Sequence, residues 1–364
     1  MLTEPKLMEP LHLLVESLVA IDSVNPSLVP GGAGEAGIAA FVAQWLRAAG
    51  LEVRVDEVAP GRPNVVGVRR GTGGGRTLLL LAHTDTVGGA LQIRIAGGRL
   101  HGRGAYDMKA GLAAAMSAAA GLDGLAGDVV VAAVCDEEAG GLGTRALLRG
   151  DLPFDAAVVP EPTDETVAIA HKGFAGFEIE TRGVAAHGSR PDLGVDGIAA
   201  MGPVLVDLAA LDARLRAGPA HPLLGTGSVH ASLIAGGQEA STYPARCVLT
   251  GEWRTVPGED PTAALEALAA SHRAELRMTH TGLPFAVDPD ADIVTTVVRH
   301  ARTGPPAGAA FWADSALLAA AGVPTVLYGP AGGGAHAADE WVDLASVTRV
   351  RDTLQAVARE FCGS

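Results

Sequence analysis

The sequence predicts an α/β protein in which helices cover both faces of a mostly parallel sheet, with a smaller α+β domain inserted into it. Three observations support this prediction. Apolar runs of strand length alternate with helical patterns over residues 1–173, as parallel strands buried on both faces require. From 174 to about 286 a period-two alternation, typical of half-exposed antiparallel strands, replaces them. The alternation of apolar strand-length runs with helical patterns then returns over residues 287–364.

The first part, residues 1–173, contains alternating helices and short strands. Residues 10–20 and 35–50 have helical spacing, and the second of these patterns closes at Gly50. Strands are expected at 51–58, 64–71, 77–83, 128–138 and 154–163, and helices at 109–122 and from 144. In a parallel sheet the chemistry gathers in the loops at the carboxyl ends of the strands, so the functional side chains are expected there.

The inserted part, residues 174–286, has a different order of elements. Alternating strands are expected at 173–183 and 246–256, a further strand at 228–237, and helices at 194–215 and 261–276. The order β-α-β-β-α-β fits a ferredoxin-like α+β domain. The chain is therefore expected to form one domain from 1–173 and 287–364, interrupted by a second domain at 174–286.

The composition excludes several classes of partner and location. Lys and Arg number 27 against 41 Asp and Glu, a net charge of -14 that argues against nucleic acid or an anionic membrane surface. No apolar run reaches the roughly 18 residues that a membrane span needs. The first 26 residues place acids inside an apolar pattern, which predicts an amphipathic helix and not a signal peptide. Three widely separated cysteines favour a reducing compartment, so a cytoplasmic location is expected.

Polar residues that strand burial does not explain follow the predicted strands. They are His83, Asp85, Glu137, Glu138 and Glu161. Taken singly each has an ordinary explanation, since a lone histidine is usually structural and an acid pair is often a solvated loop. Asp107 could equally cap the helix that follows it, and His336 alone would be unremarkable. An ordinary solvated surface does not explain why these polar residues gather after the predicted strands.

Together these residues form the set that a two-zinc site requires. Zinc binds imidazole nitrogen and carboxylate oxygen, and catalytic sites keep one position open for water. Two zinc ions that share a bridging carboxylate would use two histidines and three carboxylates. That number is supplied by His83, Asp107, Glu138, Glu161 and His336. The other acid of the 137–138 pair is then free to act as a general base, and Asp85 can orient His83.

Other enzyme classes lack their motifs. Residues 71–77 are glycine-rich but lack the last glycine of a dinucleotide fingerprint, and they precede a strand instead of following one. The sequence contains neither a phosphate-binding loop with the G-x-x-x-x-G-K-[ST] pattern nor a G-x-S-x-G nucleophile elbow. Cys135 lies at a buried strand end, where core packing is the expected role.

Eight motifs resemble, in order, those of the co-catalytic zinc peptidase family that contains acetylornithine deacetylase, succinyl-diaminopimelate desuccinylase, aminoacylase and glutamate carboxypeptidase. They are LLAHTDTV, GRGAYDMKAG, CDEEAGGLG, PEPT, AHKG, GVAAHGSRP, RTVPGED and GVPTVLYGPAGGGAHAADEWV. The resemblance covers nearly the whole chain, and eight ordered motifs are far more specific than any one of them.

The resemblance implies two zinc ions per subunit bridged by Asp107. His83 and Glu161 would complete one site, and Glu138 and His336 the other. It also implies a cis peptide bond between Asp107 and Met108.

The resemblance further implies the catalytic roles. Glu137 would activate the bridging water and pass the proton to the leaving amine, and Asp85 would hold His83. The expected reaction is hydrolysis of an N-acyl amino acid, with acetylornithine deacetylase-like activity the nearest named case. A dipeptidase or glutamate-carboxypeptidase-like activity is the alternative, and cobalt or manganese could occupy the same N/O sites.

In the family the inserted domain is a lid and dimerisation domain, so a homodimer is expected. His187 matches a histidine that reaches the partner's site to stabilise the oxyanion, and Arg254 matches an arginine associated with the substrate carboxylate. Lys172 suggests the acetylornithine deacetylase-like branch. Each could instead be local: His187 a turn residue before Gly188, Arg254 an ion-pair partner across the lid sheet, Lys172 a solvated lysine.

The sequence departs from the family pattern at two positions. Ser241 stands where an asparagine three residues before a proline is usual, which leaves open the contact that the amide would make with the oxyanion or substrate. Pro160 stands before Glu161 where glycine is common, which should stiffen the loop without removing the ligand.

Overall fold

The computed structural model describes residues 10–301 and 303–363 of the 364-residue chain. The first nine residues of the expected N-terminal amphipathic segment lie outside this range. The described chain divides into two compact units. The first contains the described residues up to Ile169 together with those of Val287–Ala307 and Ala313–Ser364, and the second contains Ala170–Ala286 and Gly308–Trp312.

Of the helices of the first unit, the first four begin within two residues of their predicted starts, and no bounds were predicted for those after residue 286. The helices are α1 (Leu11–Val19), α2 (Ala36–Ala48), α3 (Ala110–Ala120), α4 (Leu142–Leu147), α7 (Asp292–Ala301), α8 (Ser315–Ala320) and α9 (Leu344–Phe361). Asp343 caps the N-terminus of α9, because its carboxylate accepts free backbone N–H groups of the first turn. Helix α3 consists largely of alanine, and these small side chains let it pack between α1, α9 and the sheet with almost no exposed residue.

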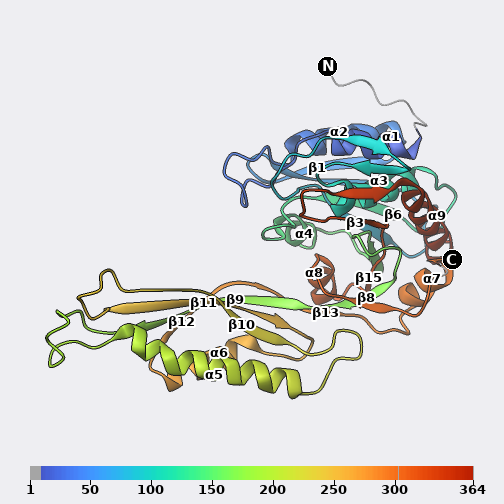
Figure 1. The fold of residues 1–364 in the computed structure, drawn as a ribbon. Coiled ribbons are helices and arrows are strands. Elements are labelled where there is room, and N and C mark those ends of the chain that lie inside the picture. Colours follow the sequence, from blue (N-terminus) through green and yellow to red (C-terminus); the bar gives the residue numbers. More distant parts are fainter. Residues whose placement is uncertain (1–9, 302, 364) are drawn as a thin grey trace. The chain divides into compact units, whose positions relative to one another are not determined.

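The large sheet is parallel at its centre and antiparallel at its margins (Figure 1). Its strands are β1 (Glu52–Ala59), β2 (Arg62–Arg69), β3 (Leu78–His83), β6 (Val129–Val134), β7 (Ala156–Val159), β8 (Ala168–His171), β13 (Phe285–Ala286), β14 (Ala307–Ala309) and β15 (Thr325–Leu327). The order is β1-β2-β6-β3-β7-β15-β8-β13, with β14 also paired with β8. Strands β6, β3, β7 and β15 run parallel, and every residue of the four is buried. The predicted α/β class with a mostly parallel sheet is confirmed.

A small antiparallel sheet in the first unit joins two distant parts of the sequence. It has the order β16-β17-β5-β4, with β4 (Arg94–Ala96), β5 (Arg99–His101), β16 (Gly332–Gly333) and β17 (Trp341–Asp343). Pairing of β17 with β5 brings the loop before β17, which carries His336, next to the turn after β5, which carries Asp107.

The second unit has the predicted order of elements. They are β9 (Gly173–Arg182), α5 (Gly197–Ala217), β10 (Ser228–Gly236), β11 (Arg246–Thr255), α6 (Pro261–Ser271) and β12 (Glu275–Gly282). The strands form an antiparallel sheet in the order β10-β11-β9-β12, and α5 and α6 cover one face of it (Figure 1). Burial alternates residue by residue along β11, as the period-two pattern predicts.

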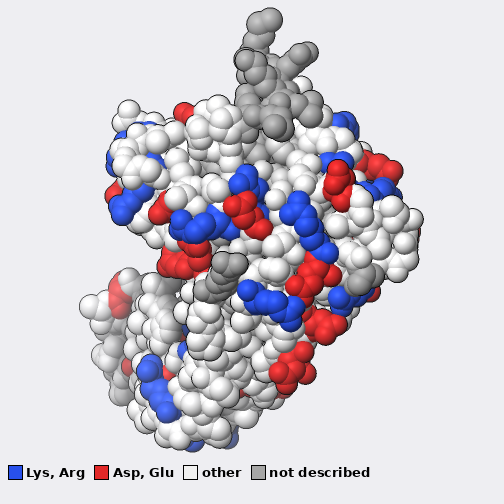
Figure 2. Space-filling view, turned by 90° about the vertical axis from the view of Figure 1, so that its right-hand side faces the viewer, with Lys and Arg blue, Asp and Glu red and all other residues white. Residues whose placement is uncertain are grey.

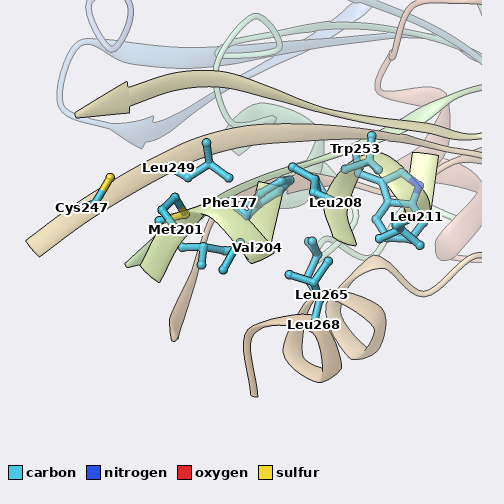
Figure 3. Packing of buried hydrophobic residues seen from close by; sticks show 13 residues of the cluster. Phe177, Met201, Val204, Leu208, Leu211, Cys247, Leu249, Trp253, Leu265 and Leu268 are labelled. Carbon is cyan, nitrogen blue, oxygen red and sulfur yellow. The ribbon is translucent and has the colours of Figure 1, made fainter. Parts of the chain in front are cut away.

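The core of the second unit lies between this sheet and its two helices. Figure 3 shows Phe177, Leu249 and Trp253 from the strands meeting Leu208 from α5 and Leu265 from α6. Burial of such side chains contributes on the order of 1.5–3 kcal/mol each.

The last helix predicted in the second unit was too long. The helix expected at 261–276 ends at Ser271, and Glu275 already begins β12. Arg273 adopts a positive φ of 55° in the turn between them, which ends the helix. The first residues of β12 then alternate in burial, as a half-exposed strand does.

Surface charge is mixed on the visible face. Figure 2 shows Lys and Arg interspersed with Asp and Glu and not gathered into one basic area on that face. Among residues 10–301 and 303–363, no helix is both long and apolar enough to cross a bilayer.

Candidate metal centre

Three of the predicted site segments meet because their strands are neighbours. His83 is the last residue of β3, Glu137 and Glu138 follow β6, and Glu161 follows β7. Strand β3 pairs in parallel with both β6 and β7, so the carboxyl ends of the three strands lie at one edge of the sheet. This edge is where ligands bind in open α/β sheets.

Asp107 reaches the same edge from the turn after β5. The buried carboxylate of Glu340 holds this turn by accepting backbone N–H groups from Gly104 at 3.0 Å, Tyr106 at 2.9 Å and Asp107 at 3.1 Å. The peptide bond between Asp107 and Met108 is cis, which confirms the expectation from the family resemblance.

The five predicted ligands come together as two groups that share Asp107. One group is His83, Asp107 and Glu161, and the other is Asp107, Glu138 and His336; within each, the candidate ligand atoms lie within 4.8 Å of one another. Asp107 Oδ1 is 3.2 Å from His83 Nε2, and Asp107 Oδ2 is 3.2 Å from His336 Nε2. His336 Nε2 is also 3.1 Å from Glu138 Oε2.

His83 is oriented by the backbone of Asp85. The Nδ1 atom of His83 donates to the Asp85 carbonyl oxygen at 2.9 Å, and since a carbonyl can only accept, Nδ1 carries the proton. Nε2 is therefore the nitrogen that faces Asp107 and is available to a metal ion. The Asp85 carboxylate is 3.6 Å from Nδ1 and instead accepts the backbone N–H groups of Glu137 and Glu138, both at 3.1 Å. Asp85 therefore touches both the histidine and the loop that carries the two glutamates.

The electrostatics of the cluster favour bound cations. Burial raises the pKa of Glu137 and of Glu161 well above the usual range, and it also raises the pKa of Glu138. His336 has its pKa raised to about 10 by hydrogen bonds to Asp107 and Glu138. The Oε1 atom of Glu161 is buried and has no hydrogen-bond partner among the described residues. Crowded carboxylates with such an unpartnered oxygen, beside two imidazoles, fit divalent metal ions of the kind that N/O sites take.

Glu137 lies beside both groups without belonging to either. Its Oε2 atom is 3.9 Å from His83 Nε2, and its side chain is 9% exposed. The carboxylate is thus free of the two ligand groups and close enough to act on a water molecule held there.

Among the buried acids that sequence reasoning missed near the cluster is Asp314, which precedes α8. Its Oδ2 atom accepts a hydrogen bond from Thr144 Oγ1 at 2.6 Å, while Oδ1 has no partner among the described residues. Burial raises the pKa of Asp314 to about 6, and its charge adds to the raised pKa of Glu137 and Glu161. The sequence around Asp314 has no strand-end or motif signal that would have singled it out.

Three predicted site residues belong to the second unit. Lys172 donates from Nζ to the Thr226 carbonyl at 2.8 Å. Arg254 makes a two-pronged ion pair with Glu252 at 2.7 and 3.2 Å, two residues away on the same strand, and its guanidinium lies 5.8 Å from the Phe174 ring centre. Arg254 therefore has an acidic partner on its own strand, β11.

His187 is exposed at a turn of the second unit. Its Nδ1 atom lies 2.8 Å from Ser189 Oγ, and His187 pairs with Thr242 in an isolated antiparallel bridge. The carbonyl of Ser241 accepts the N–H of Gly188 at 2.6 Å, so the backbone of the unusual serine holds this turn.

Comparison with known proteins gives the family. The model of peptidase family M20/M25/M40 matches residues 79–360, which include all five candidate ligands. The chain belongs to this family. The resemblance seen in the sequence is therefore confirmed, and the protein is a metal-dependent amidohydrolase of the metallopeptidase type.

Individual relatives agree with this assignment. The chain is 29% identical over 346 residues to an acetylornithine deacetylase of Myxococcus xanthus, covering 87% of this chain and 90% of that protein. It is 31% identical over 257 residues to an acetylornithine deacetylase of Vibrio cholerae, covering 67% of each. The fold is similar to the crystal structure of aminopeptidase PepT from Bacillus cereus, with a TM-score of 0.80 and 19% identity over 96% of this chain and 98% of that one.

Proposed function

We propose that the protein hydrolyses the amide bond of an N-acyl amino acid, with an activity like that of acetylornithine deacetylase. The observation that carries this proposal is the pair of ligand groups that share Asp107, with the free carboxylate of Glu137 beside them. The similarity to two acetylornithine deacetylases supports the choice of substrate class.

The cofactor that we propose is a pair of Zn²⁺ ions per subunit, with Co²⁺ or Mn²⁺ as alternatives that suit the same donors. His83, Asp107 and Glu161 would hold one ion, and Asp107, Glu138 and His336 the other. When bound, the ions supply Lewis acidity at the scissile carbonyl and lower the pKa of a water molecule.

Glu137 is the proposed general base. Its carboxylate takes the proton of the attacking water and later gives it to the nitrogen of the leaving amine. Burial raises the pKa of Glu137, so that its protonated form is accessible nearer neutrality than for an exposed glutamate. Asp85 keeps this base in place by accepting the N–H groups of the 137–138 loop, and it fixes the His83 ring through its carbonyl.

The second unit is proposed to act as a lid and to form a homodimer in the cytoplasm. His187 would stabilise the oxyanion in the partner's site, Arg254 would bind the substrate carboxylate, and Lys172 would contribute to substrate binding.

Substitution of His187 by alanine is expected to lower kcat by about 10²–10³-fold and to change KM much less, because an oxyanion contact acts mainly in the transition state. Steady-state kinetics on the zinc-loaded protein measure this split. An alanine at His230, an exposed histidine of β10, provides the control. An unchanged kcat for His187→Ala would remove this residue from the mechanism.

The substrate class is tested by amine release from matched substrates. N-acetyl-L-ornithine, N-succinyl-diaminopimelate and a dipeptide are compared at equal concentration with the zinc-loaded protein. We expect the acetylated amino acid to be hydrolysed at least about tenfold faster than the dipeptide, since a site built for one substrate leaves polar groups unpaired with another. Preference for the dipeptide would instead support a dipeptidase or carboxypeptidase of the same chemistry.

A further inference from the structure

A buried ion-pair network lies beneath the loop that carries Glu137 and Glu138. At its centre is Arg62 on β2, which is 7% exposed. Its Nε atom donates to Glu35 Oε2 at 2.8 Å, its Nη2 atom donates to the other oxygen of Glu35, and its Nη1 atom donates to Asp136 Oδ1 at 2.7 Å. Both acids are almost fully buried, so the guanidinium joins two carboxylates away from solvent.

Asp136 connects this network to the catalytic loop because it directly precedes Glu137. Its φ is +67°, a conformation that costs energy for a residue with a Cβ atom. The carbonyl of Asp136 accepts N–H groups from Gly140 and Gly141, and its own N–H donates to Glu35 at 3.2 Å. The Asp136 backbone is therefore held in a sparsely populated conformation by the same glutamate that Arg62 binds.

Asn25 makes a second connection between the network and the loop. Its Nδ2 atom donates to Asp85 Oδ2 at 2.8 Å and to Asp136 Oδ1 at 3.2 Å. Asp85 in turn accepts the backbone N–H groups of Glu137 and Glu138. Two buried chains of hydrogen bonds thus end on the same three-residue segment, one through the Asp136 backbone and one through Asp85.

Stability alone gives little reason for such a network. Burying an ion pair costs desolvation that its attraction often fails to exceed, and well-packed apolar residues can be as stable in its place. What apolar residues cannot do is aim three directed hydrogen bonds at Glu35 and Asp136 at once, as a planar guanidinium does. The contacts of Arg62 therefore fix the conformation of Asp136, the residue before the proposed base.

We propose that Arg62 is a positioning residue for the reaction. Held by Glu35, it fixes Asp136 in its left-handed conformation, and this directs Glu137 toward the attacking water and Glu138 toward its metal ion. The part of this inference that concerns Glu137 rests on the proposed function, whereas the part that concerns Glu138 is tested by metal binding alone.

The test compares Arg62→Lys and Arg62→Met with the wild-type protein. Lysine keeps the positive charge but cannot reproduce the planar, forked hydrogen bonds of the guanidinium. Arg62→Lys should therefore fold but no longer hold Asp136 in its left-handed conformation. We expect its kcat to fall by about 10–100-fold, as losses of hydrogen bonds behind metal-site residues commonly do, with KM changed less than about twofold. Calorimetric titration with Zn²⁺ should show about tenfold weaker binding of one ion, the one held by Glu138, and unchanged binding of the other. Arg62→Met should show both effects more strongly.

The control is a variant that loses stability without touching the loop. Val350 is buried in α9, and Val350→Ala removes core contacts in the same unit. Even if Val350→Ala lowers the Tm as much as Arg62→Lys does, it should keep the wild-type kcat and the wild-type affinity for both Zn²⁺ ions.

Two results would overturn the inference. One is an Arg62→Lys protein with wild-type kcat and wild-type affinity for both ions; the other is an equal loss in Val350→Ala. If Arg62→Met fails to fold, Arg62→Lys still decides. If the wild-type protein hydrolyses none of the substrates, that result counts against the proposed function, and the Zn²⁺ titrations still test the positioning role.

Discussion

Replacement of Glu137 by glutamine is expected to lower kcat by about 10²–10⁴-fold, the usual contribution of a positioned general base. Glutamine has the same shape but cannot take a proton, and Glu137 belongs to neither of the two ligand groups. Zinc content should therefore stay close to that of the wild-type protein. Kinetics together with elemental analysis of the purified variant measure both quantities.

The matched control is the same chemical change at an exposed acid, Glu52→Gln on β1, which should leave kcat unchanged. Retention of most of the turnover by Glu137→Gln would show that another group takes the proton. Asp314 would then be the first alternative, because it is a buried carboxylate near the cluster, lies outside the two ligand groups and has one oxygen without a hydrogen-bond partner among the described residues.

Replacement of Asp107 by asparagine is expected to weaken binding of both metal ions by more than about 100-fold, because a direct ligand should contribute more than the 10–100-fold typical of its supporting contacts. Asp107 is common to the two groups, and each of its oxygens faces a different histidine. Glu161→Gln and Glu138→Gln should each weaken the binding of one metal ion and leave the binding of the other unchanged. Zn²⁺ calorimetry of the three variants separates these patterns.

Asp56→Asn, at a partly exposed aspartate of β1, is the control for Asp107→Asn and should bind both ions as the wild-type protein does. If Asp107→Asn keeps either ion at wild-type affinity, Asp107 is not shared between two ions, and the assignment of the groups fails.

Much of the fold could be predicted because burial leaves a direct mark on sequence. The runs that became β3, β6 and β7 are apolar except for His83 at the end of β3, since parallel strands are covered on both faces. Once these three strands are neighbours, the residues at their carboxyl ends meet, which is why His83, the 137–138 pair and Glu161 could be singled out together.

The supporting contacts could not be predicted, because they depend on pairings between distant segments. Glu340 holds the Asp107 turn only because β17 pairs with β5. Both strands are too short for the sequence pattern to predict this pairing. Arg62 and Asn25 are separated from Asp136 by 74 and 111 positions, and nothing in their local sequence indicates contact.

The role of Asp85 shows how backbone geometry alters an inference made from residue type. A carboxylate two residues beyond a histidine suggested a side-chain partner for the ring. The structure gives that contact to the Asp85 carbonyl and turns the carboxylate toward the 137–138 loop. The functional connection is broader than predicted, because one residue now supports both a candidate ligand and the candidate base.

The most direct test of a two-metal amidohydrolase at this site is a titration of activity. Metal is removed with a chelator, Zn²⁺ is added back in known amounts, and hydrolysis of N-acetyl-L-ornithine is followed at each addition. We expect no turnover without metal and a plateau reached at two equivalents per chain. Full turnover of the metal-free protein, or two ions bound with no hydrolysis of any N-acyl amino acid, would contradict the account.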